Sequence, residues 1–372
     1  MERQARVGLD LWPALTHAPG LGRYAREFVR ALARFSEPPL LRLLDVGPGA
    51  RVLGADLAHH PAGWTRVQAD LPRAALTLLA RIGLPAERLL GGCELFHRVL
   101  PGEPPLGAVP RVQVLSELPE SGSSAERALT RALAGPVDVV VFSAAAAAAV
   151  QRRFGLAAER VHSLPVGCDH WLRDAPAREE PGEPPLVLAL GRTDERRGPL
   201  NLLAAFERLR ASGTAARLVW CGRPGDSACE LRSALAGSPV GHDLRWIEDP
   251  RESELPALVA SAAVLVHLNR AEWTPVTPLE GLASGAALVA SPLPAFREAL
   301  GDEALWIEGD PAALDPGVLA QALRAALESA RDPAARARRR ALASGYTWSR
   351  HAQLTVDLWG AILDRQALAR SL

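Results

Sequence analysis

The sequence predicts an α/β protein with two parallel sheets, one in each half of the chain. Short apolar runs alternate with helix-length segments along nearly all of the 372 residues, a pattern typical of parallel strands joined by crossover helices. The second half repeats the rhythm of the first. At roughly 150 residues per domain, the length also fits two domains.

Apolar runs predict six strands in each half of the chain. In the first half they lie at 6–11, 40–46, 94–96, 112–115, 137–142 and 161–164. In the second half they lie at 186–190, 217–221, 244–247, 264–267, 287–290 and 304–307. Helices are expected between strands, for example at 21–34, 125–134 and 200–209. Ser143 precedes a run of alanines and predicts a capped helix from residue 144, because serine caps helices and alanine favours them.

A linker is expected between the two halves. Residues 170–185 combine several prolines with charged side chains, which is typical of linker composition. We therefore predict an N-terminal domain over 1–172, a linker over 173–184 and a C-terminal domain over 185–345. Residues 346–372 predict a final amphipathic helix, since leucine and isoleucine recur there at helical spacing.

The charged residues exclude some chemistry. All 42 basic residues are arginine, so a Schiff-base lysine and a phosphate-loop lysine are both absent. The 42 acidic residues balance them, which argues against a global field that would attract nucleic acid or a membrane, although local patches could bind phosphates. The hydrophobic share of 48% is that of a globular chain.

The cysteines and the N-terminus predict a cytoplasmic protein. The four cysteines form no C-x-x-C pair, which fits reduced thiols and argues against a structural zinc site. The N-terminus begins with charges and lacks the apolar stretch of a signal peptide, and no 18 consecutive apolar residues occur. We expect a cytoplasmic chain, either free or peripheral on the inner face of the membrane.

Two carboxylates, Glu272 and Glu280, follow the strand that ends at His267. The run from Thr277 to Glu280 predicts a capping box with proline at the first helical position. The backbone N–H groups at such a helix start form a ready anion site. The alternative is that Glu280 only caps its helix and that Glu272 is a solvated loop residue.

Two arginines, Arg192 and Arg197, lie in the loop between strand 186–190 and the next predicted helix. In open α/β sheets, ligands bind beyond the carboxyl ends of the strands, and guanidinium groups suit diphosphate oxygens. The alternative is a solvated charged loop, because arginine is frequent in this chain.

Gly20 and Gly22 belong to a G-x-G-x-x-A run that opens the helix after the first strand, with Asp45 about 20 residues further on, as in dinucleotide-binding proteins. Residues 12–19, however, separate the strand from Gly20, whereas a dinucleotide-binding turn follows its strand directly. The spacing therefore argues against an NAD site.

These segments and their order resemble the retaining glycosyltransferases of family 4, which have the two-domain GT-B fold. The similar segments are Gly20–Tyr24, Leu164–Asp169, Leu190–Gly198, Glu272–Glu280 (the E-x7-E motif) and Tyr346–Ser349. Within that family, the sequence most resembles bacterial mannosyltransferases of surface polysaccharide synthesis. The resemblance implies two Rossmann-like domains that face each other across a cleft, and a last helix that crosses back to the N-terminal domain.

The resemblance also implies roles for single residues. Arg192 and Arg197 would hold the diphosphate of a nucleotide sugar, Glu272 would contact the sugar and Glu280 would bind the ribose hydroxyls. Fixed cations and the helix start at Thr277 would stabilise the negative charge that develops on the leaving group. No metal ion and no cofactor besides the donor substrate are then expected.

In the first half, the resemblance implies that Gly20 and Gly22 let the backbone approach the phosphates. His97 matches a histidine of the mannosyltransferase-like members, with a purely structural role as the alternative. Ser116 stands where the family has a sugar-contacting histidine. Pro275 lacks an N–H group that would face the donor.

The leading functional hypothesis is a retaining glycosyltransferase. It would move a hexose, such as mannose, from a nucleoside-diphosphate sugar to a glycan, lipid-linked or small-molecule acceptor. Ser116 and Pro275 favour an alternative, a catalytically silent GT-B protein that binds a nucleotide or glycan as a partner subunit. A sugar-nucleotide epimerase of the same fold is a third hypothesis. A nucleic-acid partner is not expected.

Overall fold

The structure, a computed structural model, describes residues 5–16, 20–49, 55–58, 60–173 and 183–371. The chain divides into two compact units. Unit 1 contains Met1–Pro165 and Trp348–Leu372, and unit 2 contains Val166–Thr347. The predicted linker, 173–184, therefore falls within unit 2, and residues 174–182 of it lie outside the described residues.

Unit 1 is built on a seven-stranded parallel sheet in the order β3-β2-β1-β4-β5-β6-β7. Its strands are β1 (Arg6–Asp10), β2 (Leu40–Val46), β3 (Thr65–Ala69), β4 (Leu95–Arg98), β5 (Arg111–Val114), β6 (Val137–Val141) and β7 (Val161–Ser163). The six predicted strands are confirmed within one or two residues, and β3 was missed. β3 lies at the sheet edge with half-exposed residues and lacks an apolar run, so only its pairing with β2 reveals it.

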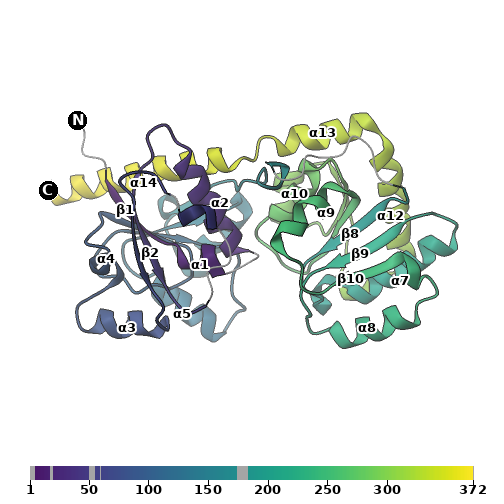
Figure 1. The fold of residues 1–372 in the computed structure, drawn as a ribbon, viewed down its shortest axis with the longest axis horizontal. Helices are drawn as coiled ribbons and strands as arrows, with labels where there is room; N and C mark the ends of the chain where they lie inside the picture. Colours follow the sequence, from purple (N-terminus) through teal and green to yellow (C-terminus); the bar gives the residue numbers. More distant parts are fainter. Residues whose placement is uncertain (1–4, 17–19, 50–54, 59, 174–182, 372) are drawn as a thin grey trace. The chain divides into compact units, whose positions relative to one another are not determined.

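The helices of unit 1 include the four that the sequence predicted, at 21–34, at 125–134, from residue 144 and within 346–372. The helices of this unit are α1 (Trp12–Thr16), α2 (Leu21–Ala33), α3 (Ala74–Arg81), α4 (Ala86–Leu89), α5 (Ser124–Ala132), α6 (Ala144–Phe154) and α14 (Trp348–Ser371). The Ser143 hydroxyl accepts a hydrogen bond from the N–H of Ala146, which confirms the predicted cap of α6. The final helix α14 packs against α2, so the end of the chain completes the first unit (Figure 1).

Unit 2 is built on a six-stranded parallel sheet in the order β10-β9-β8-β11-β12-β13. Its strands are β8 (Leu186–Leu190), β9 (Arg217–Cys221), β10 (Leu244–Ile247), β11 (Ala262–His267), β12 (Ala287–Ala290) and β13 (Ala304–Trp306), all of them predicted. Its helices are α7 (Pro199–Ala211), α8 (Ala228–Gly237), α9 (Leu255–Ala260), α10 (Val276–Ala283), α11 (Pro294–Leu300), α12 (Pro316–Arg331) and α13 (Pro333–Ala343).

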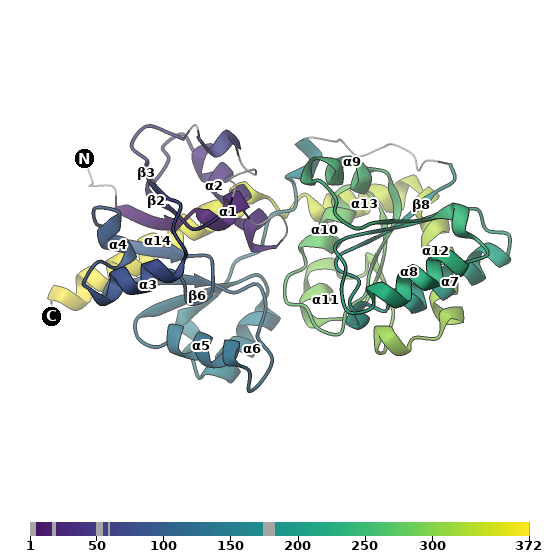
Figure 2. The ribbon, with the colours of Figure 1, turned by 60° about the horizontal axis from the view of Figure 1, so that its bottom comes forward.

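Helices cover both faces of the unit 2 sheet, as Figure 2 shows. Val264 and Val266 of the central strand β11 pack in one apolar cluster with α7 and α12. Leu265, between them, packs in a second cluster with α10 and α11. This alternation buries the strand on both faces, as is usual in parallel sheets, and leaves its carboxyl end as the place for polar residues.

No described helix is both long and apolar enough to span a bilayer.

Candidate functional site

Glu272 lies at the centre of a polar cluster just beyond β11 in unit 2. His267, the last residue of β11, places its Nε2 at 2.9 Å from Oε2 of Glu272. Asn269 Nδ2 donates a hydrogen bond to the same oxygen at 2.7 Å, and an N–H of Arg197 lies 3.4 Å from it. Three side chains therefore converge on one oxygen, and the other oxygen, Oε1, accepts no hydrogen bond from a described residue.

The cluster holds Glu272 as a carboxylate. Burial favours its neutral form, but the charges of His267 and Arg197 and the hydrogen bonds from His267 and Asn269 outweigh burial and lower the pKa to about 2. The side chain remains 21% exposed, so a ligand can reach it. At neutral pH, Glu272 can accept hydrogen bonds but cannot donate a proton.

Arg197 is fixed by the loop that carries it. It ends a short 3-10 helix, Glu195–Arg197, and its side chain is only 13% exposed. Its buried Nε donates to no described group. Gly198, which follows, has a φ of 62°, and a Cβ atom there would lie 2.2 Å from the backbone oxygen of Pro311. Only glycine fits this turn, which orients Arg197 toward Glu272.

Arg192 differs from Arg197. Its side chain is 60% exposed and contacts Asp194 at 3.4 Å. The structure therefore brings Arg197 and Glu272 together and leaves Arg192 on the surface of the same loop.

The predicted capping box at Thr277 is wrong. Helix α10 begins at Val276 with Pro275 as its N-cap residue, and no side chain caps it. Glu280 is buried on the inward side of α10, with Oε1 at 3.0 Å from Nε2 of His170, so it cannot reach back to the helix start. Pro278 has no N–H group and Leu279 donates to Pro275, so the N–H groups of residues 276 and 277 have no backbone acceptor among the described residues.

His97 belongs to a buried chain of hydrogen bonds in unit 1. Trp359 Nε1 donates to His97 Nδ1 at 3.3 Å, so the ring proton of neutral His97 is on Nε2, 3.4 Å from the Tyr24 hydroxyl. That hydroxyl then donates to His351 Nε2 at 3.0 Å, and His351 Nδ1 donates to the carbonyl oxygen of Pro165 at 3.0 Å.

Burial is the main reason why the pKa of His97 falls to about 3 and that of His351 to about 4. Both rings are therefore neutral at ordinary pH. His97 is 0% exposed, and this placement favours its structural role over contact with a substrate.

The remaining predicted residues of unit 1 lie near the carboxyl ends of strands. Gly20, with a φ of 62°, is the N-cap residue of α2, and a Cβ atom there would have no heavy atom within 4 Å. Gly22 is buried in the first turn of α2. Ser116 follows β5 and is partly exposed. Gly20 is thus exposed and Ser116 partly exposed, whereas Gly22 is buried.

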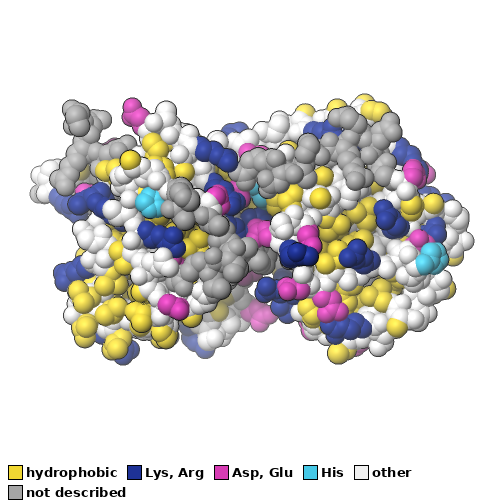
Figure 3. Space-filling model, viewed as in Figure 1, with side chains coloured by type: hydrophobic (Ala, Val, Ile, Leu, Met, Phe, Trp, Pro, Cys, Tyr) yellow, Lys and Arg dark blue, Asp and Glu magenta, His cyan; other side chains and the backbone are white. Residues whose placement is uncertain are grey.

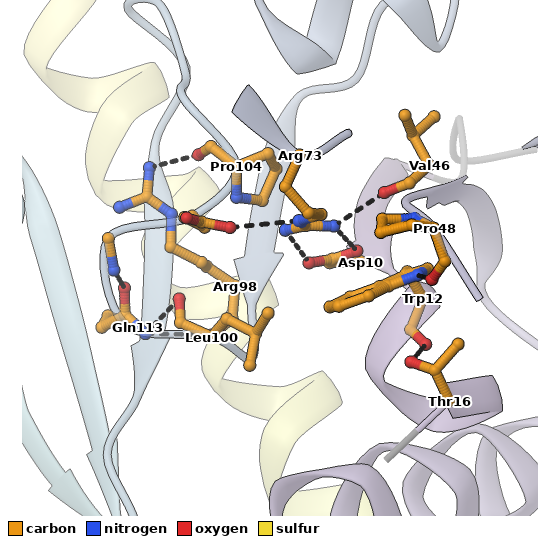
Figure 4. A network of polar contacts seen from close by, with 12 residues as sticks. Asp10, Trp12, Thr16, Val46, Pro48, Arg73, Arg98, Leu100, Pro104 and Gln113 are labelled. Carbon is orange, nitrogen blue, oxygen red and sulfur yellow. Dashed lines mark hydrogen bonds and ion pairs between the residues drawn. The ribbon is translucent and has the colours of Figure 1, made fainter. Parts of the chain in front are cut away.

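Sequence reasoning missed a polar network in unit 1, shown in Figure 4. Arg73 contacts both carboxylate oxygens of Asp10, at 2.7 and 3.1 Å, and Glu103 at 3.0 Å. Its guanidinium carbon lies 4.9 Å from the ring centroid of Trp12. Burial raises the pKa of Asp10, although the charge of Arg73 opposes this. A carboxylate at the end of an apolar strand was the signal that could have indicated Asp10.

Arg98 and Gln113 extend this network at the ends of β4 and β5 (Figure 4). Arg98 is 3% exposed and donates to the carbonyl oxygen of Pro104 at 2.8 Å. Burial lowers its pKa to about 10. The Gln113 amide bridges Gly102 and Leu100 at 3.2 Å each, so the loop after β4 is held on the carboxyl end of the sheet.

Comparison with known proteins found a family match and curated relatives for part of the chain. Residues 173–342 match the family described as glycosyl transferases group 1. The chain is 38% identical over 158 residues to the phosphatidyl-myo-inositol mannosyltransferase of Mycolicibacterium smegmatis, a match that covers 41% of this chain and 38% of that protein. It is 26% identical over 181 residues to the GDP-mannose:cellobiosyl-diphosphopolyprenol alpha-mannosyltransferase of Komagataeibacter xylinus. This match covers 48% of this chain and 46% of that protein. The chain thus spans less than half the length of these curated relatives.

Solved structures resemble the chain over nearly its whole length. Sucrose-phosphate synthase from Thermosynechococcus elongatus matches with a TM-score of 0.71 at 17% sequence identity. The match covers 99% of this chain and 100% of that one. Anabaena HepE, in complex with UDP and glucose, has a TM-score of 0.70 at 14% identity, covering 96% of this chain and 100% of that one. At these identities the likeness concerns the fold, which is GT-B. The chain thus combines two Rossmann-like units of the GT-B fold, and its residues 173–342 match the family described as glycosyl transferases group 1.

Proposed function

We propose that this protein is a retaining glycosyltransferase that moves a hexose from a nucleoside-diphosphate sugar to an acceptor. The convergence of His267, Asn269 and Arg197 on one oxygen of Glu272 carries the proposal. The family match of residues 173–342 supports it. Both curated relatives are named as mannosyltransferases, which favours mannose as the hexose.

In this proposal, Glu272 binds the sugar through Oε1. Its other oxygen is already occupied by three donors, and its low pKa keeps it an acceptor, so a sugar hydroxyl is a fitting partner. Because the neighbouring side chains fix the carboxylate before the substrate arrives, little reorganisation is needed when the glycosidic bond breaks.

Arg197 binds the diphosphate. Its contact with Glu272 is long, at 3.4 Å, and its Nε is unpartnered among the described residues, so several of its five N–H donors remain for phosphate oxygens. In this proposal the exposed Arg192, which contacts Asp194, binds the same phosphates, and the N–H groups at the start of α10, at Val276 and Thr277, add to the positive field. These groups stabilise the leaving diphosphate, so transfer needs no metal ion.

The acceptor-side and nucleotide-side roles are further parts of the proposal. Gly20 and Ser116 line the route of the acceptor or phosphates in unit 1, and Glu280 contacts the ribose after its contact with His170 rearranges. The acceptor is a glycan, a lipid-linked sugar or a small molecule. The relatives' names, which include a phosphatidylinositol and a diphosphopolyprenol, favour a lipid-linked acceptor on the cytoplasmic face of a membrane.

One observation favours a second candidate, a silent nucleotide-binding subunit. Pro275 and Pro278 leave few N–H groups at the start of α10, and Glu280 contacts His170. Such a protein would bind a nucleotide without turnover.

A panel of UDP, GDP, ADP and dTDP sugars tests the proposal. One nucleotide is expected to bind in calorimetry and to raise the melting temperature, because binding to the folded state stabilises it. Its sugar should be released slowly, or transferred with retention at the anomeric carbon. If no nucleoside diphosphate binds at millimolar concentration, both candidate functions fail; binding without turnover of any donor supports the silent subunit.

A further inference from the structure

An apolar patch lies on and beside helix α3 in unit 1. It consists of Leu71, Leu78, Ile82 and Leu84, which are 42%, 62%, 68% and 42% exposed. Among the described residues, seven large hydrophobic side chains are exposed, and four of them fall in this short stretch. At the lower left of Figure 3, where Figure 1 draws α3, apolar surface gathers accordingly.

Helix α3 is apolar on both sides, which its packing in unit 1 does not require. Leu76 is its buried anchor and packs in a cluster with Leu44 and Phe96. Leu78 and Ile82 are four residues apart, on the side turned to solvent. A surface helix ordinarily carries polar residues there, and an exposed apolar patch of this kind marks an interaction surface.

The patch is fixed near the carboxyl end of the unit 1 sheet. Arg73, the N-cap residue of α3, is held by both oxygens of Asp10 at the end of β1 (Figure 4). In open α/β sheets this end is where ligands bind. A partner that covers the patch would therefore lie close to the edge at which unit 1 can receive a ligand.

The charge of unit 1 indicates the chemistry of that partner. Unit 1 contains 22 arginines and 17 acidic residues, whereas unit 2 contains 20 arginines and 25 acidic residues. The net charge of the whole chain is zero, but unit 1 carries a net positive charge and unit 2 a net negative charge. Arg81 and Arg88 are exposed beside the patch. Apolar side chains flanked by arginines fit the interface of a bilayer that contains anionic lipids.

We propose that the apolar patch inserts into the surface of an anionic lipid bilayer, with Arg81 and Arg88 beside the lipid phosphates. A second copy of the chain is a poorer occupant, because a symmetric contact would bring together two units that each carry a net positive charge. A role of this surface in delivering a lipid-linked acceptor rests on the proposed function. Lipid binding itself is independent of the proposed function, because it requires neither a donor substrate nor turnover.

Co-sedimentation of the full chain with vesicles tests the proposal. We expect wild type to sediment with vesicles of phosphatidylcholine and phosphatidylglycerol more than with phosphatidylcholine alone, and less at high salt. Replacing Leu78 and Ile82 together by glutamine, a good helix former, should lower the partition coefficient about tenfold or more. Arg81→Gln should lower it about fivefold on anionic vesicles and little on neutral ones.

The matched control is Val318→Gln, which changes a helical apolar side chain of unit 2 that is 55% exposed. It should sediment as wild type does, and all variants should keep the wild-type melting temperature. The proposal is overturned if wild type binds neither vesicle or if the Leu78/Ile82 variant binds like wild type. A wild-type dimer that the Leu78/Ile82 variant converts to monomer, without vesicle binding, would also overturn it in favour of self-association. Nucleotide calorimetry on the same samples reports separately on the proposed function.

Discussion

Replacing Glu272 by glutamine removes a charge but keeps the size of the side chain. The folded protein holds the pKa of Glu272 at about 2, against an ordinary value of 4.5. At about 1.4 kcal/mol per pKa unit, the difference corresponds to about 3 kcal/mol of stability in the charged state. Glutamine cannot provide this, so we expect Glu272→Gln to lower the free energy of unfolding of unit 2 by about 3 kcal/mol at pH 7.

The sign of the pH dependence follows from the direction of the shift. A carboxylate whose pKa is lowered by folding stabilises the folded state when the pH is above the pKa of the unfolded state. This stability is lost as the pH falls from 4.5 toward 2. The gap between wild type and variant should therefore shrink from about 3 kcal/mol at pH 7 to about 1 kcal/mol at pH 3. Urea unfolding at both pH values, followed by tryptophan fluorescence, measures this gap.

The control is Glu308→Gln, because Glu308 forms an exposed ion pair with Arg297. It should change stability by less than about 0.5 kcal/mol. If Glu272→Gln is as stable as wild type at pH 7, or if its deficit does not shrink in acid, the cluster does not hold Glu272 ionised and the proposed sugar contact loses its basis.

Three further predictions concern the proposed reaction. Glu272→Ala should reduce turnover of the matched donor about a hundredfold or more while leaving the Kd of the bare nucleoside diphosphate nearly unchanged, and equal turnover in steady-state assays would refute a role in transfer. Arg197→Ala should weaken diphosphate binding in calorimetry by about 1.5 to 3 kcal/mol, and Arg192→Ala by less because its side chain is exposed; unchanged Kd values in both would make them surface charges. Transfer should persist in excess EDTA, and activity lost there but restored by Mg²⁺ or Mn²⁺ would contradict a metal-independent reaction.

The strands that were predicted from the sequence are those that contain a run of apolar residues. The central strands of unit 2 were found because a parallel strand buried on both faces, such as Ala262–His267, is apolar throughout. The edge strands Leu244–Ile247 and Ala304–Trp306 were found because they also carry large apolar residues. Thr65–Ala69 was missed because this edge strand carries mostly polar or small residues and has no apolar run. Strands could be predicted because buried strands are rich in apolar residues, which the sequence shows directly.

The site was only partly predictable. Glu272 and Arg197 were named from loop positions, but His267 and Asn269 were not, since nothing local shows that their side chains turn toward one carboxylate oxygen. The capping box failed because its spacing is also satisfied by an inward-facing glutamate: Glu280 follows the burial of α10 and not the needs of its first turn. Side-chain direction at a helix start is set by packing from elsewhere in the chain.

The hydrogen-bond chain from Trp359 to Pro165 has a consequence for how the protein is made. Its members come from the early and the late part of the sequence. His97 and Tyr24 are buried, so solvent water cannot replace a missing hydrogen-bond partner. While a ribosome is still adding unit 2, these groups lack their partners on α14, and leaving them buried without hydrogen bonds is costly. Unit 2 is contiguous and can fold as soon as it has been made, whereas unit 1 can reach its native packing only after α14 has also been made.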